Sequence, residues 1–386
     1  MRVLAHILPF PADATEPWFG ELPAAPAVFL LRGEGEPYVS KTANLRRRLQ
    51  RLLGSPAEHS RRLNLRNRVQ EIEYSLTGSE FESQLLLYRI LRETFPKTYA
   101  KRLRLRPAPL VKLHLENEFP RASVTTRLST RSAKHYGPFQ SRVAAEKFAS
   151  DALDFFKMRR CVDDLHPDPS FPGCIYSEMK MCLAPCFKGC TDDEYRAEVS
   201  RVQSFFDTAG ESLTRELTDQ RQHASAELAF EEAAGLHAKL EKLKPVLAQL
   251  PEIVGRLDRL QALVVQRSTD PGFVSLFRFS EFSLIGPVLL NLELHAQPES
   301  MESRVQKALS EFPSTSVNST IERTEHLAIL KRWYFRSHRL GEIFFADDQG
   351  SWPLRRIVRG IGRVHRGEQE PRVPTFSATD TTPPPS

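Results

Sequence analysis

All five cysteines of this 386-residue chain fall within thirty residues of one another: Cys161, Cys174, Cys182, Cys186 and Cys190. Disulfides usually staple small secreted domains, whereas cysteines clustered in a long chain indicate a metal ion or a metal cluster. Four of them, in the pattern C-x12-C-x7-C-x3-C, could supply the thiolates that a tetrahedral Zn²⁺ or an iron–sulfur cluster requires. The spacing does not distinguish these two, and buried, reduced cysteines are the alternative. Cys190 is then an extra thiol beside the site.

Positive charge is concentrated near the N-terminus. The net charge is +6, but residues 41–110 hold sixteen Lys and Arg against six Asp and Glu, a balance of +10, and the remainder sums to −4. Such a segment favours a polyanionic partner, because each phosphate that is neutralised releases condensed counterions. A solvated basic face without a partner is the alternative. The candidate DNA-binding cations are Lys41, Arg46, Arg47, Arg48 and Arg51.

The N-terminal part predicts a small α+β module. Two β-prone runs, residues 27–32 and 37–40, flank a Gly-rich turn and indicate a hairpin. Asn44 is placed to cap a helix whose leucines share one face, residues 71–76 alternate like a strand, and Ser79 with Glu82 has the form of a capping box for a helix over 80–94.

The rest of the chain predicts further mixed structure, so the expected class is α+β. Strands are expected within 107–136, a helix at 142–157, nearly continuous helix from 192 to 265 broken at Gly210 and Pro251, strands within 270–298, and helix and strand within 320–365. The chain is long enough for two or three domains. The expected segments are 1–20 (N-terminal), 21–105 (nuclease-like), 106–158 (linking), 159–192 (Cys-rich), 193–265 (helical), 266–365 (mixed α/β) and 366–386 (disordered tail).

No uninterrupted apolar run is long enough to span a bilayer, and the first residues are not typical of a signal peptide. We therefore expect a cytoplasmic protein that does not insert into membranes.

Four features, in this order along the chain, resemble the UvrC family, the incision subunit of bacterial nucleotide excision repair. They are the hairpin followed by LRRR, the sequence HYGPFQS at 135–141, the cysteine cluster, and ELAFEEAAGLHAKL at 227–240. The resemblance covers residues 20–300, about three-quarters of the chain. It implies a GIY-YIG nuclease fold, a Cys-rich segment and a UVR helical hairpin. It also suggests a truncated chain, without the RNase H-like catalytic site and helix-hairpin-helix repeats of the family.

In the GIY-YIG family two Tyr position the nucleophile, an Arg stabilises the developing charge, and one Glu holds Mg²⁺ or Mn²⁺. The resemblance places Tyr38 at the second Tyr, Arg48 at the Arg and Lys41 at a usual basic position. It places Phe29, which lacks a hydroxyl, at the first Tyr, and Leu87, which cannot bind a hard cation, at the metal Glu. The motif's glycines are replaced by Ala27 and Ser40. On the same helix, Glu82 lies about 140° away and Glu80 about 10 Å away, so neither replaces the ligand directly.

The resemblance also implies a cofactor and a partner. It favours a 4Fe–4S cluster on Cys161, Cys174, Cys182 and Cys186, with zinc as the alternative. It implies that residues 211–250 bind a matching hairpin in UvrB, through one face formed by Phe230, Ala233, Ala234, His237 and Leu240. This chain has His237-Ala238 where the family usually has Arg-Asp. An intramolecular hairpin that covers its own core is the alternative.

The expected function is therefore DNA repair, with binding of DNA and UvrB and with a degenerate nuclease centre. One alternative is an active single-incision endonuclease with a rewired metal site, and the other is a nucleic-acid-binding protein outside excision repair. Residues 270–365 are expected to be a remnant or a replacement of the RNase H-like half, with Asp347-Asp348 in a turn.

Overall fold

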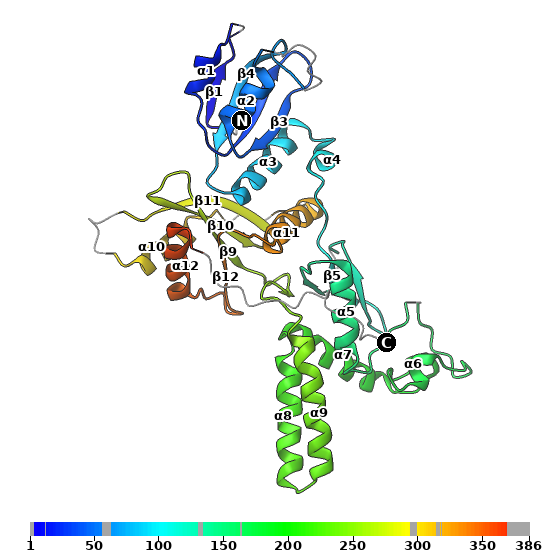
Figure 1. Ribbon diagram of the computed structural model, residues 1–386. Helices are drawn as coiled ribbons and strands as arrows, with labels where there is room; N and C mark the ends of the chain where they lie inside the picture. The colour runs from blue at the N-terminus through cyan, green and yellow to red at the C-terminus, as the bar shows by residue number, and fades with distance from the viewer. Residues whose placement is uncertain are drawn as a thin grey trace, which may run out of the picture.

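The computed structural model describes residues 4–11, 13–55, 63–129, 134–162, 164–293, 299–313, 317 and 319–368. The fold is α+β, as predicted, and its described part contains three four-stranded sheets in which all paired strands are antiparallel. Figure 1 shows the N-terminal sheet at one end, the C-terminal sheet in the centre, and a pair of helices that projects from the opposite end. In the described residues no helix is both long enough and apolar enough to cross a bilayer.

The N-terminal sheet has the order β1 (His6–Pro9), β4 (Val69–Leu76), β2 (Ala27–Gly33), β3 (Tyr38–Thr42). Helices α1 (Glu16–Glu21) and α2 (Leu45–Leu53) pack on one face, and α3 (Glu80–Thr94) packs on the other. The predicted hairpin and the helices at 45–53 and 80–94 are confirmed. Strand β1, which lies within the expected N-terminal segment 1–20, is an edge strand of this sheet.

Local sequence explains how these elements begin. The Asn44 side chain accepts a hydrogen bond from the Arg47 N–H and caps α2, as predicted. The Ser79 side chain accepts from the Glu82 N–H at 3.1 Å, but the Glu82 carboxylate accepts from the Gly78 N–H instead of the Ser79 N–H. Only half of the predicted capping box therefore forms. Gly35 takes the positive φ of 82° that the hairpin turn requires.

A second sheet follows α4 (Tyr99–Leu103). Its order is β6 (Ala122–Thr125), β5 (Leu110–Leu113), β7 (Lys134–Gly137), β8 (Gly255–Arg256), and α5 (Arg142–Leu153) packs against β5 and β6. The Cys-rich segment then contributes only the short α6 (Ile175–Glu178) and the 3₁₀ turn η1 (Pro185–Phe187) before α7 (Asp192–Asp207).

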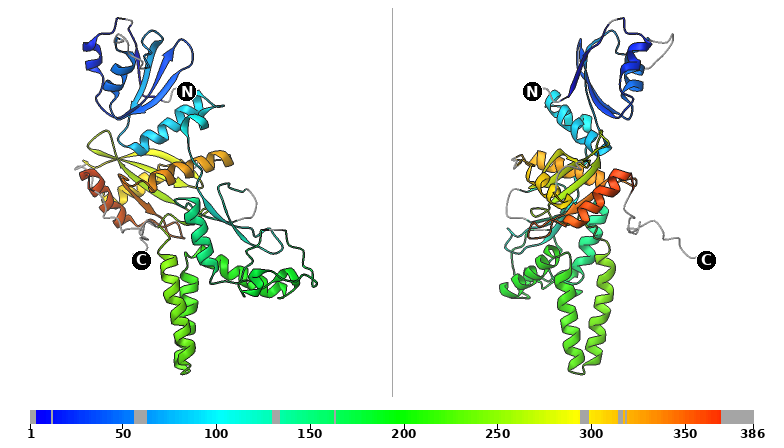
Figure 2. Two further views of the ribbon diagram at one scale, coloured as in Figure 1. Left: turned by 45° about the vertical axis from the view of Figure 1, so that its right-hand side comes forward. Right: turned by 90° about the vertical axis from the view of Figure 1, so that its left-hand side faces the viewer.

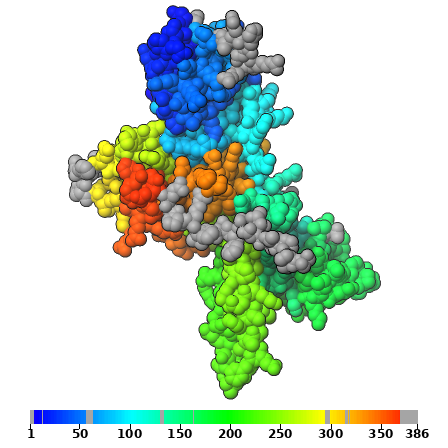
Figure 3. Space-filling view, viewed as in Figure 1, coloured from blue at the N-terminus to red at the C-terminus, as the bar shows by residue number. Residues whose placement is uncertain are grey.

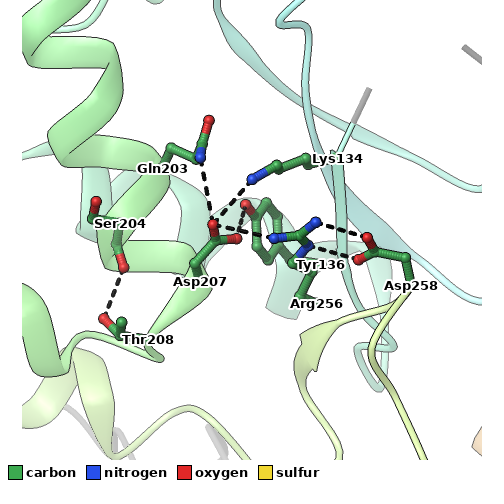
Figure 4. A network of polar contacts seen from close by, with 8 residues as sticks. All are labelled: Lys134, Tyr136, Gln203, Ser204, Asp207, Thr208, Arg256 and Asp258. Atoms are coloured by element: carbon green, nitrogen blue, oxygen red, sulfur yellow. Dashed lines mark hydrogen bonds and ion pairs between the residues drawn. The ribbon is translucent and has the colours of Figure 1, made fainter. Parts of the chain in front are cut away.

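The projecting pair consists of α8 (Glu211–Ala226) and α9 (Phe230–Leu247). Gly210 joins α7 to α8 with φ of 90°, a backbone conformation that favours glycine. Figure 4 shows Asp207 at the centre of a polar network at this base. Asp207 accepts from Tyr136 at 2.7 Å and from Lys134 at 3.1 Å, and Arg256 lies 3.5 Å away, so the network ties the end of α7 to β7 and β8.

The C-terminal sheet has the order β11 (Ser283–Asn291), β10 (Phe273–Ser280), β9 (Ala262–Arg267), β12 (Glu342–Phe345). Helices α10 (Met301–Ser310) and α12 (Leu354–Arg366) pack on one face, and α11 (Thr320–Tyr334) and α3 pack on the other. The prediction of helix up to 265 is wrong, because residues 255–256 and 262–267 are strands. The expected boundary at 265/266 therefore falls inside β9, and α10 was not predicted. The expected disordered tail lies, from residue 369, outside the described residues.

Candidate functional site

Tyr38 and Arg48 lie side by side on the face of the N-terminal sheet that carries α2. Arg48 Nη2 donates to the Tyr38 hydroxyl at 2.7 Å. Arg48 Nε is buried and has no hydrogen-bond partner in the described part of the chain. Because this Nε is buried, an anionic oxygen could reach the half-buried Arg48 only at its Nη groups, beside the phenol.

Phe29 is fully buried on the same face, with its ring centroid 6.1 Å from that of Tyr38. It belongs to the apolar core formed with Leu45, Leu49 and Ile72. Position 29 thus contributes packing, and it has no hydroxyl with which to position a nucleophile.

Lys41 lies on the opposite face, because side chains alternate along β3. It forms an ion pair with Glu80 of α3, and Arg336 lies 3.4 Å from the same carboxylate oxygen. Lys41 was expected to belong to the same site as Tyr38 and Arg48, but it lies on the other side of the sheet.

Leu87 is half-buried against the apolar cluster of Leu4, Val28, Leu30 and Ile90, on the α3 face of the sheet. The next residue, Tyr88, points away from this sheet and donates to Glu325 of α11 at 2.9 Å. Burial and the Glu325 carboxylate raise the pKa of Tyr88 above its ordinary range. Neither position offers an oxygen ligand beside Arg48.

The two acids of the first turn of α3 do not replace the missing carboxylate. Glu82 is engaged with Gly78, and burial raises its pKa. Glu80 is engaged with Lys41 and Arg336. In the described residues no group of three His, Cys, Asp or Glu side chains is arranged to hold a metal ion. The Mg²⁺ or Mn²⁺ of the GIY-YIG reaction therefore does not fit the residues around Leu87.

The remaining cations of α2 differ in their availability. Arg46 Nε donates to the Leu22 carbonyl at 2.7 Å and so ties α2 to the end of α1. Arg47 and Arg51 are exposed and lie four residues apart, on one side of the helix. Of the predicted DNA-binding set, these two are the most accessible.

The four thiols of the C-x12-C-x7-C-x3-C pattern lie near one another. Burial, together with the thiols of Cys161, Cys186 and Cys174, raises the pKa of Cys182 to about 11, while the Ala184 N–H, which donates to Cys182 Sγ at 3.3 Å, opposes this rise. All five cysteines are unpaired thiols. Burial and the carboxylates of Glu194 and Asp192 raise the pKa of Cys190, which packs against the core instead.

The loops that carry these thiols have an unusual backbone. Lys180, Ala184 and Lys188 all have φ between 56° and 59°, a conformation that side-chain-bearing residues rarely adopt. Arg159 is 2% exposed, and its Nη1 lies 3.4 Å from Cys161 Sγ while its Nε donates to the Phe119 carbonyl. The four thiols are near enough to influence Cys182 electrostatically, but in the described residues they do not form a group arranged to hold a metal ion. Thiolates are nevertheless the ligands that zinc and iron–sulfur clusters use.

The predicted partner-binding face of α9 is divided. Leu240 is buried and Ala233 half-buried toward α8, with Leu236 and Leu243, whereas Phe230, Ala234 and His237 face solvent. Leu228, at the tip of the hairpin, was not predicted as part of this face. Its side chain is 70% exposed, and that of the neighbouring Phe230 is 66% exposed. Leu228 also has a φ of 61°. The sequence did contain a signal for this tip, because two apolar residues stand at the turn of an otherwise polar hairpin.

The acidic pair near the C-terminal end lies in a turn, as predicted. Asp347 Oδ1 accepts from the N–H groups of Gln349 and Ser351, and these bonds close the loop after β12.

Comparison with known proteins gives one family. Residues 109–205 match the model of the UvrC/Cho excinuclease middle domain, a span that holds β5, β6 and β7 of the second sheet, the cysteines and most of α7. UvrABC system protein C of Rickettsia rickettsii (strain Sheila Smith) is 29% identical over 209 residues, which are 54% of this chain and 32% of that protein. UvrABC system protein C of Caldanaerobacter subterraneus subsp. tengcongensis is 24% identical over 320 residues, 81% of this chain and 52% of that protein.

The chain thus spans between a third and a half of the length of these relatives. No solved structure matches. The matched middle domain, and the similarity that extends over most of the chain, make this protein similar to the UvrC family.

Proposed function

We propose that the protein acts in nucleotide excision repair as a DNA-binding adaptor, and that its GIY-YIG centre no longer cuts. The observation that carries this proposal is the apolar packing of Leu87 at the position of the metal ligand. The relatives' printed name, UvrABC system protein C, supports the repair role. The retained Tyr38–Arg48 pair supports phosphate binding without metal-dependent hydrolysis.

The DNA contact is proposed to centre on Arg47 and Arg51. Both are exposed, whereas Arg46 and Arg48 are engaged within the protein. Replacing both with Gln should lower the slope of log K against log salt by up to about 2, because each phosphate contact contributes about 0.9. Fluorescence anisotropy with a DNA duplex at several salt concentrations measures the slope. An unchanged slope would show that the two cations are merely solvated.

Cys161, Cys174, Cys182 and Cys186 are proposed to hold a 4Fe–4S cluster. When bound, the cluster would cross-link the loops structurally. The four-cysteine pattern and the electrostatic influence of the other three thiols on Cys182 support this assignment. The three left-handed residues nearby support it as well, because their backbone conformation costs free energy. Iron analysis and visible absorbance of anaerobically purified protein test it. If the purified protein contains stoichiometric zinc and no iron, the four cysteines hold zinc and not a cluster.

The α8–α9 hairpin is proposed to bind a UvrB-type partner. Its apolar tip, Leu228 and Phe230, and the solvent-facing Ala234 and His237 support this role. The test is assembly: the chain should join a UvrB complex on a damaged duplex, as seen by a further mobility shift in a gel. A chain that binds free DNA but does not join this complex would instead favour a nucleic-acid-binding role outside excision repair.

A further inference from the structure

Cations from three separate parts of the chain lie where the N-terminal module packs on the C-terminal region. They are Lys41 of β3, Arg106 after α4, Lys331 and Arg332 in the last turn of α11, and Arg336 just beyond it, and we call them the junction cations. Figure 2 shows α3 and α11 side by side at this junction, beneath the N-terminal sheet.

Two pairs of these cations lie close together, and Arg332 is exposed on the last turn of α11. Lys41 and Arg336 approach the same Glu80 oxygen, Arg336 at 3.4 Å. Burial, and after it the nearby Arg106 guanidinium, lowers the pKa of Lys331. The side chains of Lys41, Glu80 and Arg336 are 27%, 48% and 51% exposed, so solvent and a ligand can reach them.

The carboxylates nearby do not balance this charge. Glu80 is the acid that pairs with Lys41 and Arg336, and in the described residues no salt bridge engages Lys331, Arg332 or Arg106. Glu322 and Glu325, the other acids of α11, face Arg92, Tyr88 and Tyr99 at an earlier part of the helix. The α11 dipole accounts for cations at its C-terminal end, but it does not account for Lys41 and Arg106, which approach from other elements.

We propose that the junction cations form a second phosphate-binding surface, which continues the DNA contact from the N-terminal module onto the end of α11. This inference rests on the DNA-binding role proposed above. Charge complementarity selects the partner, because closely spaced, accessible cations fit the regularly spaced phosphates of a nucleic-acid backbone.

The test uses the full chain and three variants in the same anisotropy assay. Arg332→Gln/Arg336→Gln should lower the salt slope by up to about 2, so that between 50 and 200 mM salt the wild type loses about tenfold more affinity than the variant. Arg355→Gln/Arg366→Gln is the matched control, because these arginines are 88% and 58% exposed on α12, on the other face of the C-terminal sheet. The Arg47→Gln/Arg51→Gln pair reports on the N-terminal contact.

Each outcome has one meaning. A lower slope for both the junction and the N-terminal pair, with the α12 control unchanged, supports the inference. A lower slope for the N-terminal pair alone overturns the inference and leaves the DNA-binding role intact. If the α12 control variant lowers the slope as much as the junction variant does, the effect is one of net charge alone, and the inference is overturned. No change in any variant overturns both proposals.

A further variant distinguishes a direct loss of DNA binding from a loss of folding. Glu80→Gln keeps every cation and removes the carboxylate that competes with phosphate, so it should tighten DNA binding by about two- to fivefold at low salt. If the cations served only to pair with Glu80, this variant would bind DNA no more tightly than the wild type, and the inference would fail.

Discussion

Leu87 and Phe29, which the proposed function places at polar positions of a nuclease motif, both lie in apolar packing. Phe29 joins the core under α2, and Leu87 joins the cluster under α3, so the two departures lie on opposite faces of one sheet. Restoring either residue alone would leave the other half of the chemistry absent. The residues that remain, Tyr38 and Arg48, are those that need only to bind an anion.

Leu87→Glu should destabilise the protein without producing incision. The change removes the buried apolar surface of a half-buried leucine, which should lower the free energy of unfolding by about 1–2 kcal/mol. Leu87→Met, which preserves volume, should cost less than about 1.5 kcal/mol. Urea unfolding of the two variants measures the difference. A Leu87→Glu variant as stable as the wild type that also bound Mn²⁺ would show that this site accepts a metal ligand.

The sequence predicted the Tyr38–Arg48 neighbourhood, because a strand end and the following helix are close along the chain. It did not predict that Lys41 faces the other way, although the alternation of side chains along a strand implies it. It could not predict the meeting of Lys41 with Arg336, since that contact depends on the packing of two distant segments.

At the scale of elements, the hairpin α8–α9 was predicted from the resemblance to a UVR hairpin, and both of its helices lie within the expected 211–250. The strand β9 was missed because ALVVQR is a short apolar run that fits a buried strand or a buried helix equally well. The expected face of α9 was too wide, since the residues spaced at 233, 236, 240 and 243 are those that pack against α8.

The hairpin tip should carry binding energy for its partner and little folding energy. Leu228→Asn/Phe230→Ser should weaken binding to a UvrB-type protein by at least about tenfold, as expected for exposed apolar anchors, with thermal stability unchanged. Asn tolerates the left-handed backbone at position 228. Ile321→Ser, at a site 66% exposed on α11, is the matched control. Calorimetric titration measures both variants, and equal affinity for wild type and tip variant would contradict the assigned surface.

At the scale of the whole molecule, α3 joins the N-terminal module to the C-terminal region. The Phe81 ring lies 5.0 Å from that of Phe277 and 5.1 Å from that of Trp333, and Arg89 donates to the Gly286 carbonyl at 2.9 Å. The helix that carries the metal ligand in the family is therefore packed on both sides. The sequence showed the apolar residues of α3 but not which of them face each neighbour.

This junction should be sensitive to acid through His326, which packs against Tyr88 and accepts from the Leu284 N–H at 3.1 Å. Burial, with Arg89 and Arg92, lowers the pKa of His326 to about 4, while Glu322 opposes the shift. In the unfolded chain His326 therefore binds a proton near pH 6.5, whereas in the folded chain it stays neutral until the pH approaches 4. The stability contributed by neutral His326 is complete above pH 6.5 and is lost as the pH falls toward 4, by up to about 3 kcal/mol.

His326→Gln keeps an acceptor for the Leu284 N–H and removes the titration. Its unfolding midpoint in urea should fall less than that of the wild type between pH 7 and pH 4.5. Parallel pH profiles for the two proteins would show that His326 is not buried in the neutral form.

The central claim is tested most directly by incision. The chain is mixed with UvrA, UvrB, a damaged duplex labelled at one end, and Mg²⁺ or Mn²⁺, alongside an Arg48→Ala variant of the same chain. The account predicts that the wild type binds the complex and nicks the duplex no more than Arg48→Ala does. Robust nicking by the wild type that Arg48→Ala abolishes would contradict it, and would show that a rewired centre still cuts.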